Sequence, residues 1–328
     1  MPNLRSLSAL ALAVMLLAGL PAIAGAQTVL RFAHTISTED TMHLAVVEFG
    51  KKVAQRTGNA VRIEVFPAGQ LGNDTKILES VKLGAVDLVM TGNPFFSSFA
   101  PEMNVLDLPY LFRDYEHAYK VVDGPIGAEL LRAVERNGMK GIGSLEIGFR
   151  NVTNSKRPVR TPDDMKGLKI RTTPNPAHLL AFRLLGANPV PMAFTEVYLA
   201  LKTGTVDGQE NPLTLIQAMK FYEVQKYLSL TQHAYTVANV VMNAQKYAAL
   251  TADQQKALHE ALHEAVVWQR RLNREREGAA LAQMRAAGVQ VEEQPDRAAF
   301  RKLVADPAAE DYVKKFGRAT LDRIIETR

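Results

Sequence analysis

The chain has 328 residues, enough for two domains, and its 47% apolar and 22% charged residues are typical of a folded globular protein and not of a disordered one. The formal net charge of +5 is spread along the chain without a basic arm, which argues against a nucleic-acid-binding surface. There is no cysteine, so disulfides are excluded, and so is lipid attachment through a cysteine at a processed N-terminus.

Residues 1–26 have the pattern of a Sec-type signal peptide. Arg5 precedes the apolar run 9–20, and Ala24-Gly25-Ala26 forms a small-residue cleavage site. The apolar run is too short to span a bilayer comfortably, so the alternative of a membrane anchor is the weaker one. We therefore expect cleavage after Ala26 and a free periplasmic protein that begins at Gln27.

Strands and helices alternate through the first half of the mature chain. Alternating apolar and polar residues predict strands, and apolar residues one turn apart predict helices. The expected elements are a strand at 28–34, a helix from about 41, a strand at 61–66, a helix at 74–83 and a strand at 85–90. This order is typical of a parallel sheet.

After Arg150 the same alternation starts again. Helices at 116–122 and 126–137 and a strand at 140–145 are followed by a strand at 169–172, a helix at 176–185, a strand at 189–190 and a helix at 195–202. The repetition predicts a second α/β domain that begins near Ile147.

The last third of the chain predicts a strand at 234–243 and a helix of unusual length. Thr251 and Gln254 have the spacing of a capping box, and the helix can then run to about Ala287, before Gly288. A helix this long is expected to lie across both domains.

The fold class predicted is α/β, with two domains, a hinge, an inter-domain cleft and a long helix spanning both domains. The expected division is 27–147 plus 237–276 for domain I, and 148–236 plus 277–328 for domain II. No low-complexity linker separates the halves, so the chain crosses through ordered elements, with hinges near Ile147 and Tyr235. Ligands bind preferentially at such domain interfaces.

Two arginines and an amide between residues 148 and 212 predict a carboxylate site. Arg150 follows a glycine and a phenylalanine, Arg171 lies in the strand expected at 169–172, and Asn211 ends Asp-Gly-Gln-Glu-Asn. A guanidinium presents a planar fork of donors that matches the two oxygens of a carboxylate. The alternative for each arginine is a structural ion pair. For Arg171, spacing alone does not decide between ligand binding and such an ion pair.

Glu210 lies between two residues of this predicted site. If 208–211 is extended, Gln209 and Asn211 share one side and Glu210 points to the other. A buried carboxylate beside an anionic ligand would repel it. We therefore expect Glu210 to pair with a structural arginine or a backbone donor.

Several motifs together resemble one family. They are 66–72 (FPAGQLG), 104–112, 161–171 (TPDDMKGLKIR), 192–211 (MAFTEVYLALKTGTVDGQEN) and 220–226. The sequence resembles the extracytoplasmic solute-binding proteins of TRAP transporters over nearly the whole mature chain. The resemblance implies a periplasmic protein of two α/β domains that closes on a carboxylate and delivers it to a sodium-driven membrane permease, without a cofactor and without enzymatic activity.

The resemblance also implies roles for particular residues. In that family an arginine matching Arg171 makes the paired contact with the ligand carboxylate, and residues matching Arg150 and Asn211 assist it. An aromatic matching Phe194 lies against the ligand, although Phe194 is also open to a reading as a core residue.

The ligand expected is a small hydroxylated monocarboxylate, a sugar acid such as an aldonate or uronate. The similarity includes binders of sialate and diketogulonate, but Thr35 and Gly92 stand where the sialate binders carry asparagine and glutamate. A pantoate-like hydroxy acid, sialate and a C4-dicarboxylate remain alternatives. The expected partner is the permease, with a receptor as the alternative, and the protein is expected to be a monomer that binds no nucleic acid.

Five further polar residues are expected to line the cleft: His34, Asp74, Asn93, Glu146 and Asn175. Asp74 is expected to bond a ligand hydroxyl. For His34, which closes the first strand, a hydrogen-bonded framework histidine is an equally open reading.

One competing motif points to an enzyme. His259-Glu260-Ala261-Leu262-His263 matches the His-Glu-x-x-His pattern of zinc proteases, with both histidines on one helix face. The metzincin continuation would place glycine and histidine where this chain has Val266 and Gln269, so the third zinc ligand is missing from that pattern. A secreted hydrolase using this pair, or a cleft acid such as Glu146, is therefore the weaker hypothesis, and no metal is expected.

Overall fold

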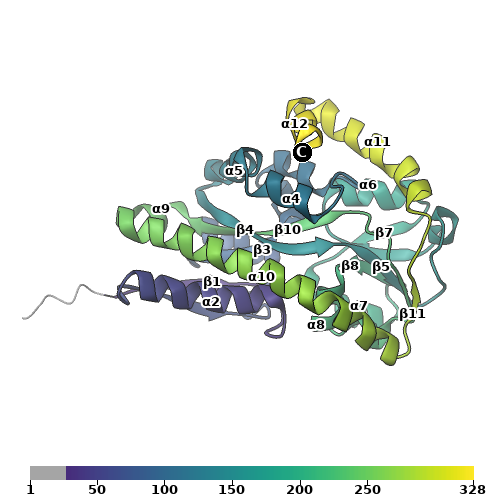
Figure 1. The fold of residues 1–328 in the computed structure, drawn as a ribbon, viewed down its shortest axis with the longest axis horizontal. Helices are drawn as coiled ribbons and strands as arrows, with labels where there is room; N and C mark the ends of the chain where they lie inside the picture. The colour runs from purple at the N-terminus through teal and green to yellow at the C-terminus, as the bar shows by residue number, and fades with distance from the viewer. Residues whose placement is uncertain (1–26) are drawn as a thin grey trace, which may run out of the picture.

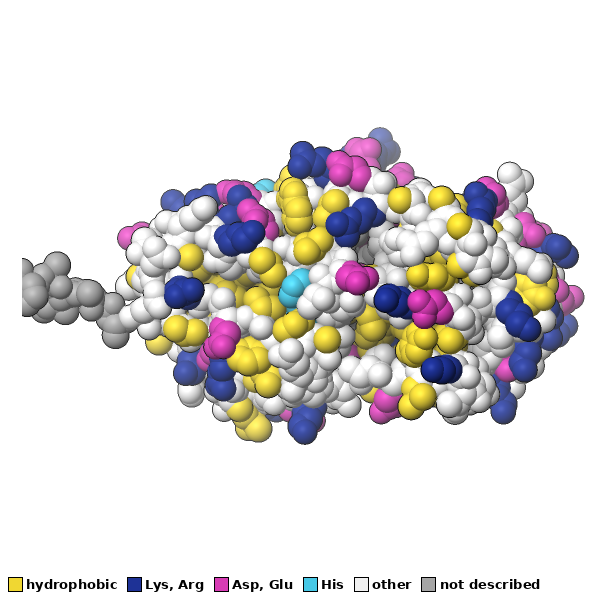
Figure 2. Space-filling view, turned by 90° about the horizontal axis from the view of Figure 1, so that it is seen from below, with side chains coloured by type: hydrophobic (Ala, Val, Ile, Leu, Met, Phe, Trp, Pro, Cys, Tyr) yellow, Lys and Arg dark blue, Asp and Glu magenta, His cyan; other side chains and the backbone are white. Residues whose placement is uncertain are grey.

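The computed structural model describes residues 27–328 and shows two α/β lobes joined by one long helix (Figure 1). The expected signal peptide, residues 1–26, lies outside the described residues. Within 27–328, no helix has the length and apolarity needed to cross a bilayer. On the face shown in Figure 2, basic and acidic side chains are interspersed and do not gather into a patch of one sign.

Lobe I contains a five-stranded sheet in the order β2-β1-β3-β10-β4. Its strands are β1 (Thr28–Ala33), β2 (Val61–Phe66), β3 (Leu88–Gly92), β4 (Met139–Phe149) and β10 (Tyr235–Asn243). β1 pairs in parallel with β2 and β3, as the alternation of strands and helices predicts. β10 runs antiparallel to β3 and β4, because it returns from lobe II, so the sheet is mixed and not purely parallel.

Lobe II contains a six-stranded sheet in the order β11-β9-β5-β8-β6-β7. Its strands are β5 (Asn151–Asn154), β6 (Lys169–Thr172), β7 (Asn188–Pro191), β8 (Gly208–Asn211), β9 (Tyr227–Ser229) and β11 (Gln290–Glu292). β6 pairs in parallel with β7 and β8, whereas β5 is antiparallel to β8 and β9. Arg171 and Asn211 therefore lie on neighbouring strands of one sheet.

Helices cover the sheets. The α-helices are α2 (Thr41–Arg56), α3 (Asp74–Lys82), α4 (Tyr115–Val122), α5 (Pro125–Arg132), α6 (Pro176–Leu184), α7 (Val197–Lys202), α8 (Leu213–Ala218), α9 (Ala244–Ala248), α10 (Ala252–Ala286), α11 (Arg297–Phe316) and α12 (Ala319–Glu326). Short 3₁₀ helices are η1 (Asn93–Ser98), η2 (Pro101–Asp107), η3 (Ala133–Asn137), η4 (Pro162–Met165), η5 (Phe194–Glu196) and η6 (Phe221–Val224). The helix expected at 195–202 is thus a 3₁₀ turn followed by α7.

The long helix α10 confirms the prediction of a shared brace. It has 35 residues, and the capping box between Thr251 and Gln254 is formed at its start. It packs on α2 and β4 of lobe I and on α8 of lobe II, and Figure 1 shows it running across both lobes. Buried Leu258 and Met284, near its two ends, belong to one continuous hydrophobic cluster, so burial of apolar area stabilises the contact of α10 with both lobes.

Two strands carry the chain between the lobes. β4 continues beyond the 140–145 expected from sequence and reaches Phe149, directly before Arg150. Its pairing with β10 is irregular between Thr236 and Val237, near the expected hinges. At the C-terminus, α11 packs on α6 and η2, and α12 packs on α5 of lobe I, although the sequence division assigned 277–328 to domain II. The boundaries themselves stay a prediction.

Candidate functional site

A narrow cavity lies between the two lobes. It is lined by Thr35, Ile36, Met42, Asp74, Met90, Thr91, Gly92, Pro94, Phe95, Ile147, Arg150, Arg171, Thr173, Phe194, Asn211, Leu215, Thr236 and Ala238. Five of the residues expected from sequence, the two arginines with Asp74, Phe194 and Asn211, are therefore brought together. They come from both lobes, as an inter-domain cleft requires.

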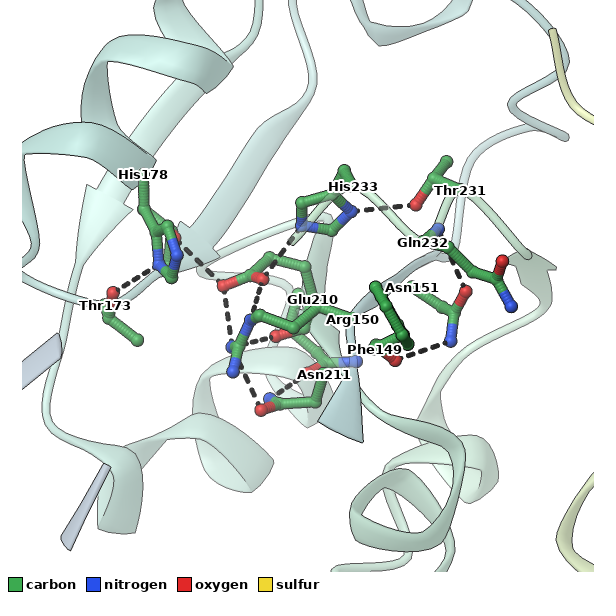
Figure 3. A network of polar contacts seen from close by, with 12 residues as sticks. Phe149, Arg150, Asn151, Thr173, His178, Glu210, Asn211, Thr231, Gln232 and His233 are labelled. Atoms are coloured by element: carbon green, nitrogen blue, oxygen red, sulfur yellow. Dashed lines mark hydrogen bonds and ion pairs between the residues drawn. The ribbon is translucent and has the colours of Figure 1, made fainter. Parts of the chain in front are cut away.

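Arg150 is a buried arginine whose charge is compensated within the protein. Its Nε donates to Oε2 of Glu210, and its Nη2 donates to Oε1 of Glu210 at 2.9 Å and to Oδ1 of Asn211 at 3.0 Å (Figure 3). Burial alone would raise the pKa of Glu210, but the Arg150 charge and a hydrogen bond from His233 hold that pKa well below its usual range. The prediction that Glu210 pairs with a structural arginine is confirmed.

Arg171 is equally buried but has no acidic partner among the described residues. Its Nε and Nη2 donate to the carbonyl of Met192 at 3.2 and 2.7 Å, while Nη1, within 27–328, has no hydrogen-bond partner. Burial, with the Arg150 charge, lowers the pKa of Arg171 to about 10, so the side chain is still a cation at neutral pH. Its guanidinium lies 5.8 Å from the centre of the Phe194 ring.

Asn211 is positioned by its neighbours on β8. Its Nδ2 donates to Oε1 of Gln209 at 2.5 Å, so these two side chains share one side of the strand, as the extended geometry predicts. Its Oδ1 accepts from Arg150. Asn211 therefore holds the Arg150 guanidinium at the cavity wall.

Lobe I contributes one acidic group to the cavity. Asp74, 3% exposed, accepts hydrogen bonds at Oδ1 from Thr35 at 2.9 Å and from Thr91 at 2.5 Å. Its Oδ2 is buried without a partner in the described part of the chain. Burial raises the pKa of Asp74. Such a carboxyl can bond a ligand hydroxyl, either as acceptor or, when protonated, as donor.

His34 and Asn93 were expected in the cleft but do not line the cavity. His34 is fully buried, and its Nε2 lies 3.0 Å from Nδ1 of His43, which matches the framework reading. Asn93 donates to the carbonyl of Met103 and to Asp107. Both side chains are thus engaged in holding lobe I together.

Glu146 and Asn175 are likewise absent from the cavity lining. Glu146 accepts from Arg274 at 2.5 Å and from Tyr119 at 2.7 Å, which ties β4 to α10 and α4. Asn175 caps α6 and donates to Asp107 at 2.9 Å, which links the two lobes. None of these four residues therefore lines this cavity, contrary to the expectation that they line the cleft, and a ligand contact by any of them stays a prediction.

Sequence reasoning missed several wall residues. Thr236, on β10, lines the cavity with an Oγ1 that is buried and, in residues 27–328, without a partner. Met90, Ile147 and Ala238 form apolar wall on the lobe I strands. No sequence signal singled them out, because they lie in apolar runs and face the cavity only through the pairing of β3, β10 and β4.

The two histidines of the zinc-protease pattern lie on α10, away from the cavity. Nδ1 of His259 lies 3.0 Å from the carbonyl of Ile142, and its Nε2 lies 3.0 Å from the Tyr247 hydroxyl. Both ring nitrogens are thereby engaged. In the described residues no group of three potential ligands from histidine, cysteine, aspartate and glutamate is placed to hold a metal ion.

The fold and the cavity define a two-lobed solute-binding protein for small anions. Residues 32–315 match the family model of bacterial extracellular solute-binding proteins, family 7 (DctP). The chain belongs to this family, and it is a TRAP-type solute-binding protein.

Individual relatives agree with this assignment. The chain is 41% identical over 285 residues, 87% of each chain, to the 2,3-diketo-L-gulonate-binding periplasmic protein YiaO of Escherichia coli. It is similar to a TRAP solute-binding protein of Polaromonas bound to D-erythronate, with a TM-score of 0.89, 38% identity and coverage of 92% of this chain and 99% of that one. A TRAP solute-binding protein of Bordetella bronchiseptica, whose bound density is interpreted as pantoate, has the same TM-score and identity, with coverage of 92% of this chain and 100% of that one.

Proposed function

We propose that this protein captures a hydroxylated monocarboxylate, a sugar acid such as an aldonate or uronate, in the cavity between its lobes. The observation that carries the proposal is Nη1 of Arg171, a buried cationic donor without a partner in the described chain. A buried charge left unpaired costs several kcal/mol. A ligand carboxylate at this atom removes that cost, and Arg150 and Asn211 support it.

The charges around the cavity favour one carboxylate over two. Arg150 is compensated by Glu210, so Arg171 remains as the cation that a ligand can neutralise. A second carboxylate at the lobe I wall would lie near Asp74, which repels it when ionised and offers at most one proton when neutral. Hydroxyl groups suit that wall better, in line with the sugar acids bound by relatives.

Capture is proposed to proceed by closure of the lobes about hinges near Ile147 and Tyr235, followed by delivery to membrane permease subunits. The family is periplasmic, and the pattern of residues 1–26 supports export by a cleavable signal peptide. We propose a monomer without nucleic-acid binding and without enzymatic turnover.

The test is a thermal-shift screen of the mature protein against uronates, aldonates, pantoate, sialate and C4-dicarboxylates, with product analysis of each mixture. Binding to the native state stabilises it according to ligand concentration over Kd. We expect stabilisation by hydroxylated monocarboxylates with no product formed. A dicarboxylate as the most stabilising ligand would contradict the proposed ligand class, and turnover would contradict the binding role.

A further inference from the structure

The lobe I side of the cavity is largely apolar. Ile36, Met42, Met90, Ile147 and Ala238 line it, and each is at most 9% exposed and belongs to the main hydrophobic cluster. The core of lobe I therefore reaches the ligand space directly. A ligand group placed against these side chains finds no hydrogen-bond partner on them.

Gly92 shows how this wall is closed. A Cβ built at Gly92 would lie 3.4 Å from Cδ1 of Ile147, so the Ile147 side chain occupies the space beside the glycine. β3 and β10 pair Gly92 with Ala238 in register. Two residues with little or no side chain, Gly92 and Ala238, thus lie beside the Ile147 alkyl group on this wall.

Few of the fully buried polar atoms of the cavity wall lack a partner in the described residues. In residues 27–328, three buried atoms of wall residues lack a partner: Nη1 of Arg171, Oδ2 of Asp74 and Oγ1 of Thr236. The hydroxyls of Thr35 and Thr91 already donate to Asp74. These three atoms suit one carboxylate and about two hydroxyl groups.

We propose that the ligand is a short hydroxy monocarboxylate with an alkyl group, whose hydroxyls bond Asp74 and Thr236 and whose alkyl group packs on Met90, Ile147 and Ala238. This inference rests on the proposed capture of a hydroxylated monocarboxylate and narrows that class, away from the fully hydroxylated aldonates and uronates. A chain with a hydroxyl on every carbon would bury some of them against apolar side chains, and a buried hydroxyl without a partner loses affinity.

Two acids bound by relatives make a matched pair for the test. Pantoate and erythronate share a four-carbon chain with hydroxyls on the second and fourth carbons. On the third carbon pantoate carries two methyl groups and erythronate carries one hydroxyl. Isothermal titration of the mature protein with D-pantoate and D-erythronate therefore compares an alkyl group with a hydroxyl at one position.

We expect pantoate to bind roughly ten-fold more tightly, because two buried methyl groups gain hydrophobic free energy and the hydroxyl loses its water. Erythronate binding as tightly as pantoate, or glucuronate binding more tightly than both, would overturn this inference and leave the proposed function standing. Failure of all three monocarboxylates to bind would overturn both.

Two variants of one wall residue test whether this wall causes the preference for pantoate over erythronate. Ile147→Val and Ile147→Thr have side chains of nearly equal shape that differ by a methyl group against a hydroxyl. We expect the pantoate-to-erythronate affinity ratio to be roughly five-fold lower in Ile147→Thr than in Ile147→Val. Ala238→Ser, compared with wild type, adds a hydroxyl to the same wall on β10 should a variant of Ile147 fail to fold. An unchanged ratio in the folded variants would contradict the assignment of this wall.

Discussion

The two buried arginines of the cavity differ in what surrounds them. Arg150 lies between Glu210 and Asn211, which bond its Nε and Nη2. Arg171 contacts a backbone carbonyl and an aromatic ring, and in the described chain its Nη1 is bonded to nothing. The Arg150 charge is thus compensated within the protein, whereas we propose that a ligand compensates the Arg171 charge. Mutations in the first should change stability, and mutations in the second should change binding.

Loss of the Glu210 charge is expected to give the largest change, a loss of folding stability. Glu210→Gln leaves Arg150 as a buried cation without its counterion, and breaking a buried pair from one side costs about 3–5 kcal/mol. Denaturant unfolding should show a loss of that size. The control is Glu64→Gln, the same change at an exposed strand position, which should stay within about 0.5 kcal/mol of wild type. Equal effects of the two substitutions would contradict the structural role of Glu210.

Removal of Arg171 should separate binding from folding. Arg171→Ala is expected to weaken ligand binding by roughly 100-fold or more, because the carboxylate loses its unshared cationic donor. The free energy of unfolding of the unliganded protein should fall little, since no ion pair within the described residues is lost. Titration calorimetry and denaturant unfolding of the same preparation measure the affinity and the free energy of unfolding.

Arg171→Lys keeps the charge without the planar fork and should bind with intermediate affinity. Unchanged affinity in Arg171→Ala would refute the assignment.

A glycine of lobe I lies in close contact with the segment after Met192, and we propose that this contact limits closure of the lobes. A Cβ at Gly69 would lie 3.0 Å from the Thr195 methyl group, in the segment after Met192. Gly69→Ala should raise Kd roughly ten-fold by overpacking this contact. Gly138→Ala is the matched control, because Gly138 has the same φ of +73° and open space around its Cα. Equal affinities of the two variants would show that this contact does not limit closure.

The Arg150 region contains a second carboxyl whose titration should be visible in stability. Burial raises the pKa of Asp107 from 3.8 to about 8, against an opposing hydrogen bond from Asn93 and the charge of Arg150. Between these two pKa values the folded chain holds a proton that the unfolded chain has lost. The contribution of this proton to the free energy of unfolding is complete below about pH 4 and is lost as pH rises through 8. Between pH 5 and 7.5, the unfolding free energy of wild type should fall relative to Asp107→Asn by about 1 kcal/mol per pH unit. Parallel pH profiles would exclude a protonated Asp107.

The fold could be predicted from the sequence where the signals are local. The capping box at Thr251 and the glycine at 288 define α10, and the alternation of side chains along 208–211 separates Gln209 and Asn211 from Glu210. The antiparallel placement of β10 depends on where the chain returns from lobe II, which no local pattern encodes.

The charged and amide residues of the site could be predicted from sequence, whereas its neutral wall residues could not. Arg150, Arg171 and Asn211 carry a recognisable chemistry. Glu146 looked equally available, but its partner Arg274 is 128 residues away in sequence, so its structural role appears only in three dimensions. Thr236 and Ile147 face the cavity through strand pairing, and their residue types gave no reason to single them out.

The most direct test of the account is a crystal structure of the mature protein with the most stabilising acid from the screen. We predict a carboxylate oxygen about 3 Å from Nη1 of Arg171, with the alkyl or hydroxyl part directed toward lobe I. A carboxylate bound away from Arg171, with Nη1 contacted only by water or a neutral ligand group, would contradict the claim that the ligand carboxylate pairs with this arginine.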